Sequence, residues 1–497
     1  MPSQAPARPE SIDPSNPATG AVAAVVVLAA GAGTRMKSAH PKVMHPIAGR
    51  PLVWHALRAA AALHPADLVT VIGHGREIVG DYLRRSVPQT RLAVQEEQLG
   101  TGHAVACALA DAPAPAGIVV VTYGDVPLLS GEMLQELVAG HRAGGNAVTV
   151  LTARVGDPRG YGRIVRDDTG SVTGIVEHKD ADQAQLAIDE INSGVYAFDG
   201  DFLAGALPRI GAANSQGEQY LTDAVGLATA DGLRVGTVQA TDPVDIEGVN
   251  DRVQLAALAR VLNDRLVRAA QLCGVTVLDP ATTWIHADVR IGRDTVIAPG
   301  TSLEAGTIVG EGATIGPDTT LSECTVADGA SVIRSHCQGA QIGAGATVGP
   351  FSFLRPGAVL QAKAKVGAFV EIKGSTVGEG AKVPHLSYVG DATIGAGTNI
   401  GAGTITANYD GVHKYPTVVG ENCFVGTDST LVAPVTIADG AYVAAGSTIT
   451  DDVAPGELGI ARGRQSVIAG WVLRRRAGTA SAASAEAAGA TDPRAAQ

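Results

Sequence analysis

Apolar residues in the first half of the chain form short continuous runs that alternate with amphipathic segments. The runs Val22–Ala29, Leu68–Ile72 and Gly117–Thr122 predict buried strands, and Pro51–Leu63 and Thr101–Ala110 predict helices between them. Strands separated by helices predict a parallel sheet covered on both faces. Ligands of such sheets bind beyond the carboxyl ends of the strands. The first predicted helix places on one face Leu52, Val53, Ala56, Leu57 and Ala60.

A longer helical pattern follows this alternation and covers residues 246–272. Its apolar residues recur at helical spacing, which predicts a single helix that connects the two halves of the chain. These residues are Val253, Leu258, Val261, Leu262, Leu266 and Ala269.

After residue 272 the apolar residues recur every six positions, in three separate runs. A sustained six-residue repeat is typical of a parallel β-helix, in which each apolar residue points inward and each coil stacks on the previous one. The repeat breaks at Thr406–Thr417, which predicts a loop projecting from the solenoid, where functional residues tend to lie. The repeat positions are Ile291, Ile297, Leu303, Val309, Ile315 and Leu321, then Ile342, Val348, Leu354, Leu360, Val366 and Ile372, then Val419, Val425, Leu431, Ile437, Val443 and Ile449.

Composition and charge argue against several classes of protein. The 497 residues carry a formal charge of −12, which argues against nucleic-acid or membrane-surface binding because such proteins usually present a cationic face. The five cysteines are scattered without a CxxC or Cys/His cluster, so we expect reduced thiols in a cytoplasmic protein. Arg8 before the first apolar run imitates a secretory signal, but Glu10 and Asp13 intervene, and cleavage would remove the first predicted strand.

The segment after the first strand combines glycines with cations. In LAAGAGTRM, which spans Leu28–Met36, glycines let backbone N–H groups approach phosphate oxygens, and Arg35 adds a planar cation. Lys42 follows shortly afterwards. Alone, this pattern also fits an ordinary turn between a strand and a loop. It is not a Walker loop, because the GK[ST] ending is missing.

Further motifs in the chain resemble those of known proteins. LAAGAGTRM, PKVMHPIAGRPL, QEEQLGTGHA, YGDVPL, YGRIV, IVEHKD, INSGVY and EGVN occur in the order found in sugar-1-phosphate nucleotidyltransferases. Together with the six-residue repeats, HLSYVGD and NYDG, they resemble the bifunctional N-acetylglucosamine-1-phosphate uridyltransferase/glucosamine-1-phosphate acetyltransferase family (GlmU type) over about residues 22–472. The resemblance implies an α/β fold: a Rossmann-like nucleotidyltransferase domain followed by a left-handed parallel β-helix of hexapeptide repeats.

The resemblance also implies a division of the chain. We expect a disordered tail at 1–20, a uridyltransferase domain at 21–245, a linker helix at 246–272, a β-helix acetyltransferase domain at 273–472 and a disordered tail at 473–497. The Pro, Ala and Ser content of the first tail and the Ala, Gly and Ser content of the second also favour disorder.

In the first half the resemblance implies a UTP and UDP-N-acetylglucosamine site with Arg35 and Lys42 as the triphosphate clamp. Asp125 and Asn250 are implied as Mg²⁺ ligands, which agrees with the preference of Mg²⁺ for few protein oxygens. The sugar contacts are implied to be Gly162, Glu177 and Asn192. The nucleotide contacts are implied to be Leu28, Ala29, Ala30, Gly31, Gln95, Gly100, Thr101, Tyr123 and Gly124.

In the second half the resemblance implies a site for glucosamine 1-phosphate and acetyl-CoA. A histidine in a solenoid is usually a surface residue, but His385 lies in the catalytic motif of the family and is implied as the general base. Glu371 is expected to orient or stabilise it, and Lys414 to reach substrate. The implied acceptor contacts are Arg355, Lys373, Tyr388 and Asn399, and the implied acetyl-CoA contacts are Ala402, Asn408, Tyr409, Thr427, Ala445 and Arg462.

Members of this family are homotrimers, so the resemblance implies acetyl sites between neighbouring β-helices. It also implies a role in peptidoglycan synthesis. Thr427 stands where the family pattern has Ser, and the sequence around Arg462 is irregular. Two alternatives remain open at this stage. One is a single-activity sugar-1-phosphate nucleotidyltransferase with a regulatory or oligomerising β-helix, and the other is a solenoid that binds partners.

Overall fold

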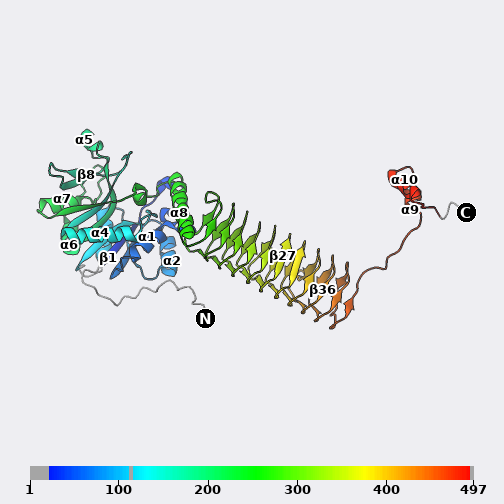
Figure 1. Cartoon of the computed structure of the whole chain (residues 1–497). Helices are drawn as coiled ribbons and strands as arrows, with labels where there is room; N and C mark the ends of the chain where they lie inside the picture. Colours follow the sequence, from blue (N-terminus) through cyan, green and yellow to red (C-terminus); the bar gives the residue numbers. More distant parts are fainter. Residues whose placement is uncertain (1–21, 111–115, 493–497) are drawn as a thin grey trace. The chain divides into compact units, whose positions relative to one another are not determined.

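A computed structural model describes residues 22–110 and 116–492, and the predicted tail at 1–20 lies outside them. The chain divides into two compact units. The amino-terminal unit comprises Met1–Val289 with Ser302–Gly306, and the β-helix unit comprises Arg290–Thr301 with Thr307–Gln497. Figure 1 shows helices around a sheet in the first and stacked coils in the second.

A mixed sheet forms the centre of the amino-terminal unit. Its strands follow the order β11–β7–β10–β6–β1–β4–β5, and β8 and β9 form a hairpin beside β10. Along this order all neighbours are parallel except β10, which is antiparallel to β7 and β6. The strands are β1 (Val22–Ala29), β4 (Asp67–Ile72), β5 (Arg91–Val94), β6 (Ile118–Tyr123), β7 (Val148–Arg154), β8 (Arg163–Arg166), β9 (Val172–Val176), β10 (Glu190–Asp199) and β11 (Val235–Gln239).

Helices cover both faces of this sheet, as the sequence pattern predicted. The Ser130 side chain caps one helix by accepting from the Met133 N–H, and the Asp251 side chain caps another by accepting from the Val253 and Gln254 N–H groups. The helices are α1 (Leu52–Ala61), α2 (Arg76–Ser86), α3 (Thr101–Leu109), α4 (Gly131–Gly144), α5 (Gln183–Leu186), α6 (Gly200–Ala206), α7 (Asp223–Ala230) and α8 (Arg252–Leu272). Short 3₁₀ turns are η1 (Thr34–Met36), η2 (Lys42–Met44), η3 (Leu207–Arg209) and η4 (Pro243–Ile246).

Strand β1 lies in the middle of the sheet and is buried on both faces. Val25 and Val27 join the core that contains α1 and α4, whereas Val26 and Leu28 join the core that contains α3 and α7. Successive side chains of a strand point to opposite faces, so one continuous apolar run supplies both cores. The end of this run is thereby held rigidly at the edge of the sheet where the candidate site lies.

The β-helix unit consists of three parallel sheets of very short strands, which form a left-handed parallel β-helix (Figure 1). The first sheet contains β15 (Val296–Ile297), β18 (Thr314–Ile315), β21 (Ser331–Val332), β24 (Thr347–Val348), β27 (Lys365–Ala368), β30 (Lys382–His385), β33 (Asn399–Ile400), β36 (Phe424–Val425), β39 (Tyr442–Val443) and β41 (Leu458–Gly459). The second contains β19 (Thr320–Ser322), β22 (His336–Gln338), β25 (Phe353–Leu354), β28 (Glu371–Lys373), β31 (Tyr388–Gly390), β34 (Ile405–Ala407), β37 (Thr430–Val432) and β40 (Thr448–Ile449). The third contains β14 (Arg290–Ile291), β17 (Ile308–Val309), β20 (Thr325–Val326), β23 (Gln341–Ile342), β26 (Val359–Leu360), β29 (Thr376–Val377), β32 (Ala392–Ile394), β35 (Thr417–Val419) and β38 (Val435–Ile437).

The six-residue repeat explains this coil. Every apolar repeat position is buried except Ile291, which is partly buried, so each turn of the solenoid contributes three inward side chains. Neighbouring coils approach so closely that some corners exclude a side chain. A Cβ at Gly343 would lie 2.6 Å from the carbonyl carbon of Gln361. Small residues after the repeat positions therefore allow the coils to stack.

The carboxyl end differs from the prediction of a disordered tail from residue 473. The structure has α9 (Trp471–Arg475) and α10 (Ala480–Ala487), and the Thr479 hydroxyl accepts from the Ala482 N–H to cap α10. The alanine content that indicated low complexity also gives high helix propensity, which accounts for the difference. Among the described residues, no helix is both long and apolar enough to cross a bilayer.

Candidate functional site

A cavity of about 380 Å³ opens on the amino-terminal unit at the carboxyl ends of its parallel strands. Leu28 and Ala29 end β1, Tyr123 ends β6, and Gln95 follows β5. This is the edge at which the alternating pattern predicted a ligand site. The lining residues are Leu28, Ala29, Ala30, Gly31, Lys42, Val43, Gln95, Gln98, Gly100, Thr101, Ala104, Tyr123, Asp125, Glu218 and Asn250.

Two cations and two oxygen ligands meet at one side of this cavity. The Lys42 ammonium forms an ion pair with Asp125, and both side chains are only 15% exposed. The Asn250 Oδ1 accepts from Arg35 Nη2 at 2.9 Å and from Lys42 Nζ at 3.5 Å. The Val249 N–H donates to the Asp125 carbonyl at 2.9 Å, which holds the two oxygen-bearing segments together. The predicted clamp and the predicted metal ligands therefore lie in one cluster.

Gln95 is predicted to contact the uracil base, and hydrogen bonds hold its side-chain amide in one orientation. Its Nε2 donates to the Gly100 carbonyl at 3.0 Å and lies 3.1 Å from His103 Nδ1. With Nε2 engaged in this way, Oε1 is the amide atom available to accept from a ligand. Gly100 has a φ of +114°, and a Cβ there would lie 2.5 Å from the Gln219 carbonyl oxygen, so this turn requires glycine.

The predicted sugar contacts form a second cluster on the strands beside β10. The Asn192 N–H donates to the Gly162 carbonyl at 2.9 Å, and a Cβ at Gly162 would lie 3.3 Å from Glu177 Oε1. Burial raises the pKa of Glu177, and the nearby Asp180 and Asp223 carboxylates raise it further. The arrangement brings the Glu177 carboxyl and Asn192 together beside Gly162, which has no side chain.

Tyr123 connects the two clusters. Burial raises the pKa of its phenol, and the charges of Glu177 and Asp125 add to that effect. Gly124, the next residue, donates its N–H to the Leu28 carbonyl at 2.9 Å and so fixes the end of β6 to β1. The nucleotide and sugar contacts predicted from the sequence are thus held by one sheet edge.

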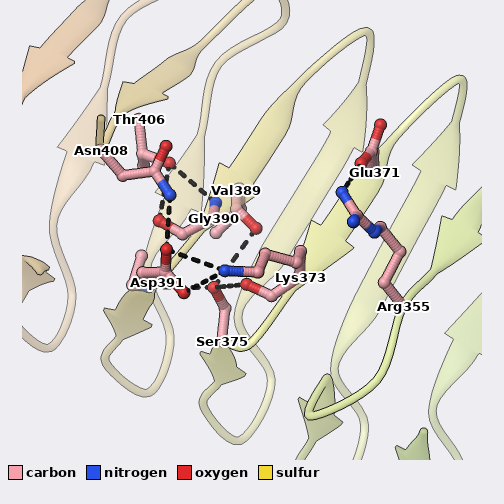
Figure 2. Close-up of polar contacts among 10 residues, drawn as sticks. Arg355, Glu371, Lys373, Ser375, Val389, Gly390, Asp391, Thr406 and Asn408 are labelled. Atoms are coloured by element: carbon pink, nitrogen blue, oxygen red, sulfur yellow. Dashed lines mark hydrogen bonds and ion pairs between the residues drawn. The ribbon is translucent and has the colours of Figure 1, made fainter. Parts of the chain in front are cut away.

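The β-helix unit carries the second set of predicted residues, and Figure 2 shows four of them: Arg355, Glu371, Lys373 and Asn408. Arg355 follows β25, Glu371 and Lys373 lie on the neighbouring strand β28, and Tyr388 on β31 pairs in register with Glu371. Arg355 Nη1 donates to Glu371 Oε1 at 2.9 Å (Figure 2). Within one chain the Glu371 carboxylate therefore pairs with Arg355 one coil away, and its expected role toward His385 stays a prediction.

Asn399 does not join this group. It lies on β33 in the first sheet, whereas Arg355, Lys373 and Tyr388 lie at the second. Residues on different faces of a solenoid point in different directions, so these four predicted acceptor contacts do not converge within a single chain. His385, at the end of β30, is exposed.

Three of the predicted acetyl-CoA contacts form a line with His385 along one corner of the β-helix. The N–H group after each position bonds to the equivalent carbonyl one coil earlier. Gly403 donates to His385 at 3.4 Å, Asp428 to Ala402 at 2.7 Å and Gly446 to Thr427 at 2.8 Å. The line therefore runs through His385, Ala402, Thr427 and Ala445, and Arg462 Nη1 donates to the Ala445 carbonyl at 2.9 Å. We call this set the corner line.

The predicted projecting loop begins after β34, at the corner between the second and third sheets. Asn408 is buried and accepts from the Tyr415 N–H at 2.9 Å, whereas Tyr409 is exposed and its hydroxyl donates to the Gly411 carbonyl at 2.6 Å. Tyr409 and Lys414 form an isolated antiparallel bridge. The loop is thus a short hairpin with one buried and one exposed predicted contact.

Several residues near the sites escaped the sequence reasoning. Gln98 lines the cavity and donates from Nε2 to the Ala30 carbonyl at 2.7 Å, and Glu218 also lines it. Gln98 lies within QEEQLGTGHA, so the motif pointed to it, but Glu218 lies in a loop without a motif. Asp391 contacts Lys373 and Asn408 (Figure 2), and the HLSYVGD motif that contains it was recognised for its other members.

A metal site of side-chain carboxylates, thiols and imidazoles is not evident. The described residues contain no group of three or more His, Cys, Asp or Glu side chains suited to hold an ion. All five cysteines lie in the described ranges and are unpaired thiols. Any metal would accordingly depend on a small donor set such as Asp125 and Asn250.

Comparison with known proteins covers both units. Residues 25–185 match the family described as a MobA-like NTP transferase domain, and residues 288–323 and 416–451 match the bacterial transferase hexapeptide (six repeats). The chain is 57% identical to the bifunctional protein GlmU of Streptomyces avermitilis, over 94% of this chain and 97% of that protein. It is 55% identical to the bifunctional protein GlmU of Mycolicibacterium gilvum, over 94% of each chain.

Proposed function

The chain belongs to the GlmU family of bifunctional proteins, and from this premise we propose how its two units divide the synthesis of UDP-N-acetylglucosamine. It is a bifunctional enzyme that acetylates glucosamine 1-phosphate with acetyl-CoA and transfers the uridylyl group of UTP to N-acetylglucosamine 1-phosphate. The product supplies cell-wall synthesis. The roles of individual residues, the metal and the assembly are our proposals.

In the amino-terminal unit we propose that UTP occupies the cavity with its phosphates at Arg35 and Lys42. The phosphate of the sugar substrate is already an anion, so it attacks the α-phosphorus of UTP without a side-chain nucleophile, and pyrophosphate leaves. The two cations stabilise the charge that develops on the phosphoryl oxygens. Gly162, Glu177 and Asn192 hold the sugar so that the attacking oxygen is in line. Catalysis by this unit is positioning and electrostatic stabilisation.

We propose that Mg²⁺ serves this site through Asp125 and Asn250. Their two oxygens already approach one cation, the Lys42 ammonium, so the chemistry of the donor set fits a divalent ion. Mg²⁺ takes few protein oxygens and completes its shell with water and phosphate. When bound, it would neutralise phosphate charge and so favour departure of pyrophosphate.

In the β-helix unit we propose that acetyl-CoA lies along the corner line with its thioester near His385. His385 accepts a proton from the substrate amine as the amine nitrogen forms its bond to the acetyl carbon. The carbon–sulfur bond then breaks, and the thiol of CoA leaves. Thr427, Ala445 and Arg462 contact the remainder of the cofactor, and Asn408 and Tyr409 contact it from the loop. The observation that supports this placement is the alignment of His385 with three predicted acetyl-CoA contacts, each one coil apart.

We propose that the acceptor site is completed by further copies of the chain in a homotrimer. Arg355, Lys373 and Tyr388 lie at one sheet and Asn399 on another, so a sugar phosphate that contacts all four needs more than one chain. Glu371 then acts by holding Arg355. Unpaired thiols and phosphorylated substrates support a cytoplasmic enzyme.

One experiment tests the assignment of both steps. The full chain is incubated with glucosamine 1-phosphate, acetyl-CoA, UTP and Mg²⁺, each omitted in turn, and products are measured by mass spectrometry. We expect N-acetylglucosamine 1-phosphate to accumulate without UTP or Mg²⁺, and no UDP-sugar without acetyl-CoA. Formation of UDP-glucosamine in the absence of acetyl-CoA, at the full rate, would contradict the proposed order.

A further inference from the structure

Asp391 lies between two groups of predicted contacts in the β-helix unit. Its Oδ1 and Oδ2 accept from Lys373 Nζ at 2.6 and 2.9 Å, and its Oδ2 also accepts from Asn408 Nδ2 at 2.6 Å (Figure 2). Lys373 belongs to the proposed acceptor site and Asn408 to the proposed acetyl-CoA site. One carboxylate thus joins the two substrate sites.

The main chain of Asp391 strengthens this connection. Its carbonyl accepts from the Thr417 N–H at 3.2 Å, and its N–H donates to the Lys373 carbonyl at 3.0 Å. Asn408 and Thr417 stand at the two ends of the projecting loop, so Asp391 holds both ends of the loop together. The loop carries Tyr409, a proposed acetyl-CoA contact.

The carboxylate leaves Lys373 able to bind an anion. An ammonium has three N–H donors, and Asp391 engages it through its two oxygens, so a donor remains for a substrate phosphate. Partial burial acts to raise the pKa of Asp391, but hydrogen bonds from Lys373 and Asn408 and the charges of Lys373 and Lys414 lower it overall. The group is therefore ionised throughout the pH range in which the enzyme would be assayed.

Asp391 also occupies a backbone conformation that does not favour a side chain. Its φ is +50°, and the equivalent corner one coil earlier is Gly374, with a φ of +54°. A side chain in this left-handed region is strained where glycine is not, although aspartate tolerates it better than most residues. Glycine fits this left-handed corner without strain, so Asp391→Gly removes the carboxylate without disturbing the backbone.

We propose that Asp391 is a positioning residue that couples the acetyl-acceptor site to the acetyl-CoA site by holding Lys373 and Asn408 in one network. This proposal depends on the proposed function of the β-helix unit. Asp391 touches neither reacting group. It acts through Lys373, which it orients toward the sugar phosphate, and through the loop base, which it fixes in place for acetyl-CoA.

The test compares Asp391→Gly with Asp391→Asn in the full chain. Asp391→Gly removes the carboxylate and relieves the corner, and we expect KM for glucosamine 1-phosphate and KM for acetyl-CoA each to rise by about 10–100-fold. Asp391→Asn keeps a neutral acceptor and should recover part of both values. Uridyl transfer from supplied N-acetylglucosamine 1-phosphate should be unchanged, which reports that the amino-terminal unit is folded, and hydrogen exchange over the coils beside Asp391 reports the folding of the β-helix unit.

The matched control is Asp294→Gly, which changes an exposed aspartate with a φ of +61° on another coil of the β-helix unit. We expect it to leave both KM values unchanged. A normal pair of KM values in Asp391→Gly would overturn the proposal, and so would a rise in only one of them, because a residue of one site does not couple two. If Asp391→Gly failed to fold, Asp391→Asn would decide by the same criterion. If the wild type did not acetylate at all, the proposed function would fail instead.

Discussion

The two units assemble their candidate sites in opposite ways. In the amino-terminal unit, Arg35 and Asn250 are 215 residues apart in sequence, yet they share a hydrogen bond beside a cavity enclosed by one sheet edge. In the β-helix unit, His385, Ala402, Thr427 and Ala445 recur once per coil and lie in a row on an exposed corner. The first site forms where segments distant in sequence converge, and the second forms where equivalent positions of successive coils align.

This difference has a physical cause. A twisted sheet with crossover connections brings the ends of distant strands to the same edge, so polar side chains can surround a ligand from several directions. Each coil of a solenoid contacts only its neighbours, so side chains repeat along its surface and do not face one another. A single β-helix consequently offers a surface where the amino-terminal unit offers a cavity, which supports our proposal that another chain completes its site.

The largest expected effect comes from removing His385, the proposed general base of the β-helix unit, and it should leave the activity of the other unit intact. His385→Ala should reduce acetyl transfer by about 10²–10⁴-fold, because a positioned general base contributes that much to proton transfer. Uridyl transfer should be unchanged. Steady-state acetylation measures the loss, and we expect it in kcat more than in KM because Arg355 and Lys373 remain. His336→Ala, a histidine elsewhere on the β-helix, is the control, and near-normal kcat in folded His385→Ala would show that another group is the base.

The converse variant acts on the amino-terminal unit alone. Asp125→Ala removes the only carboxylate of the proposed metal ligands, and we expect uridyl transfer to fall by roughly 10²–10³-fold, as for loss of a principal charge-stabilising group. Acetyl transfer should persist, because distant sites behave independently. Both rates are measured on one sample, with the exposed Asp81→Ala as control. Loss of acetylation in a folded Asp125→Ala protein would mean that the two sites are not separate.

A smaller effect tests how the cavity of the amino-terminal unit selects the nucleobase of its substrate. Gln95 Oε1 can accept from the N3–H of uracil, whereas cytosine presents an acceptor there and leaves the amide unpaired. Gln95→Leu should reduce the ratio of kcat/KM for UTP over CTP by about 10–100-fold. A ratio is used because partial unfolding affects both nucleotides equally. Equal turnover of UTP and CTP by the wild type would refute the assignment, and Gln89→Leu should leave the ratio unchanged.

The smallest effect probes the solenoid itself. Ile315 is fully buried at a repeat position, and Ile315→Val should lower the stability of its coil by about 0.5–1.5 kcal/mol. Hydrogen exchange followed by mass spectrometry should show faster exchange in this and adjacent coils, since coils are coupled mainly to their neighbours. The strands of the amino-terminal sheet should be unaffected. Uniform acceleration over both units would mean that they unfold together.

Regular patterns made most of the fold predictable. The run at β1 and the six-residue positions from Ile297 onward are buried as their spacing indicated, because period and burial follow directly from strand and coil geometry. The helix at Ala480–Ala487 was not predicted, since its alanines carry no periodic signal.

The candidate sites were predictable only where a motif marked them. Lys42, Asp125 and Asn250 lie together as their motifs suggested, but Glu218 reaches the cavity from a loop whose sequence has no distinguishing feature. The pairing of Glu371 with Arg355 depends on which strands are neighbours, and sequence spacing alone does not give that information. In both cases the contacts depend on which segments of the folded chain lie next to each other.

The corner line gives the β-helix a property that a cavity lacks. Adjacent strands are about 4.8 Å apart, so the three steps from His385 to Ala445 span about 14 Å. In the proposed mode of binding, the coils form evenly spaced steps along the acyl donor, with the reacting end at His385 and the far end at Arg462. Adding or removing one coil between them would change the length of acyl donor that fits by about 4.8 Å while leaving the reacting end untouched. Donor length and reaction chemistry can therefore vary independently in this architecture.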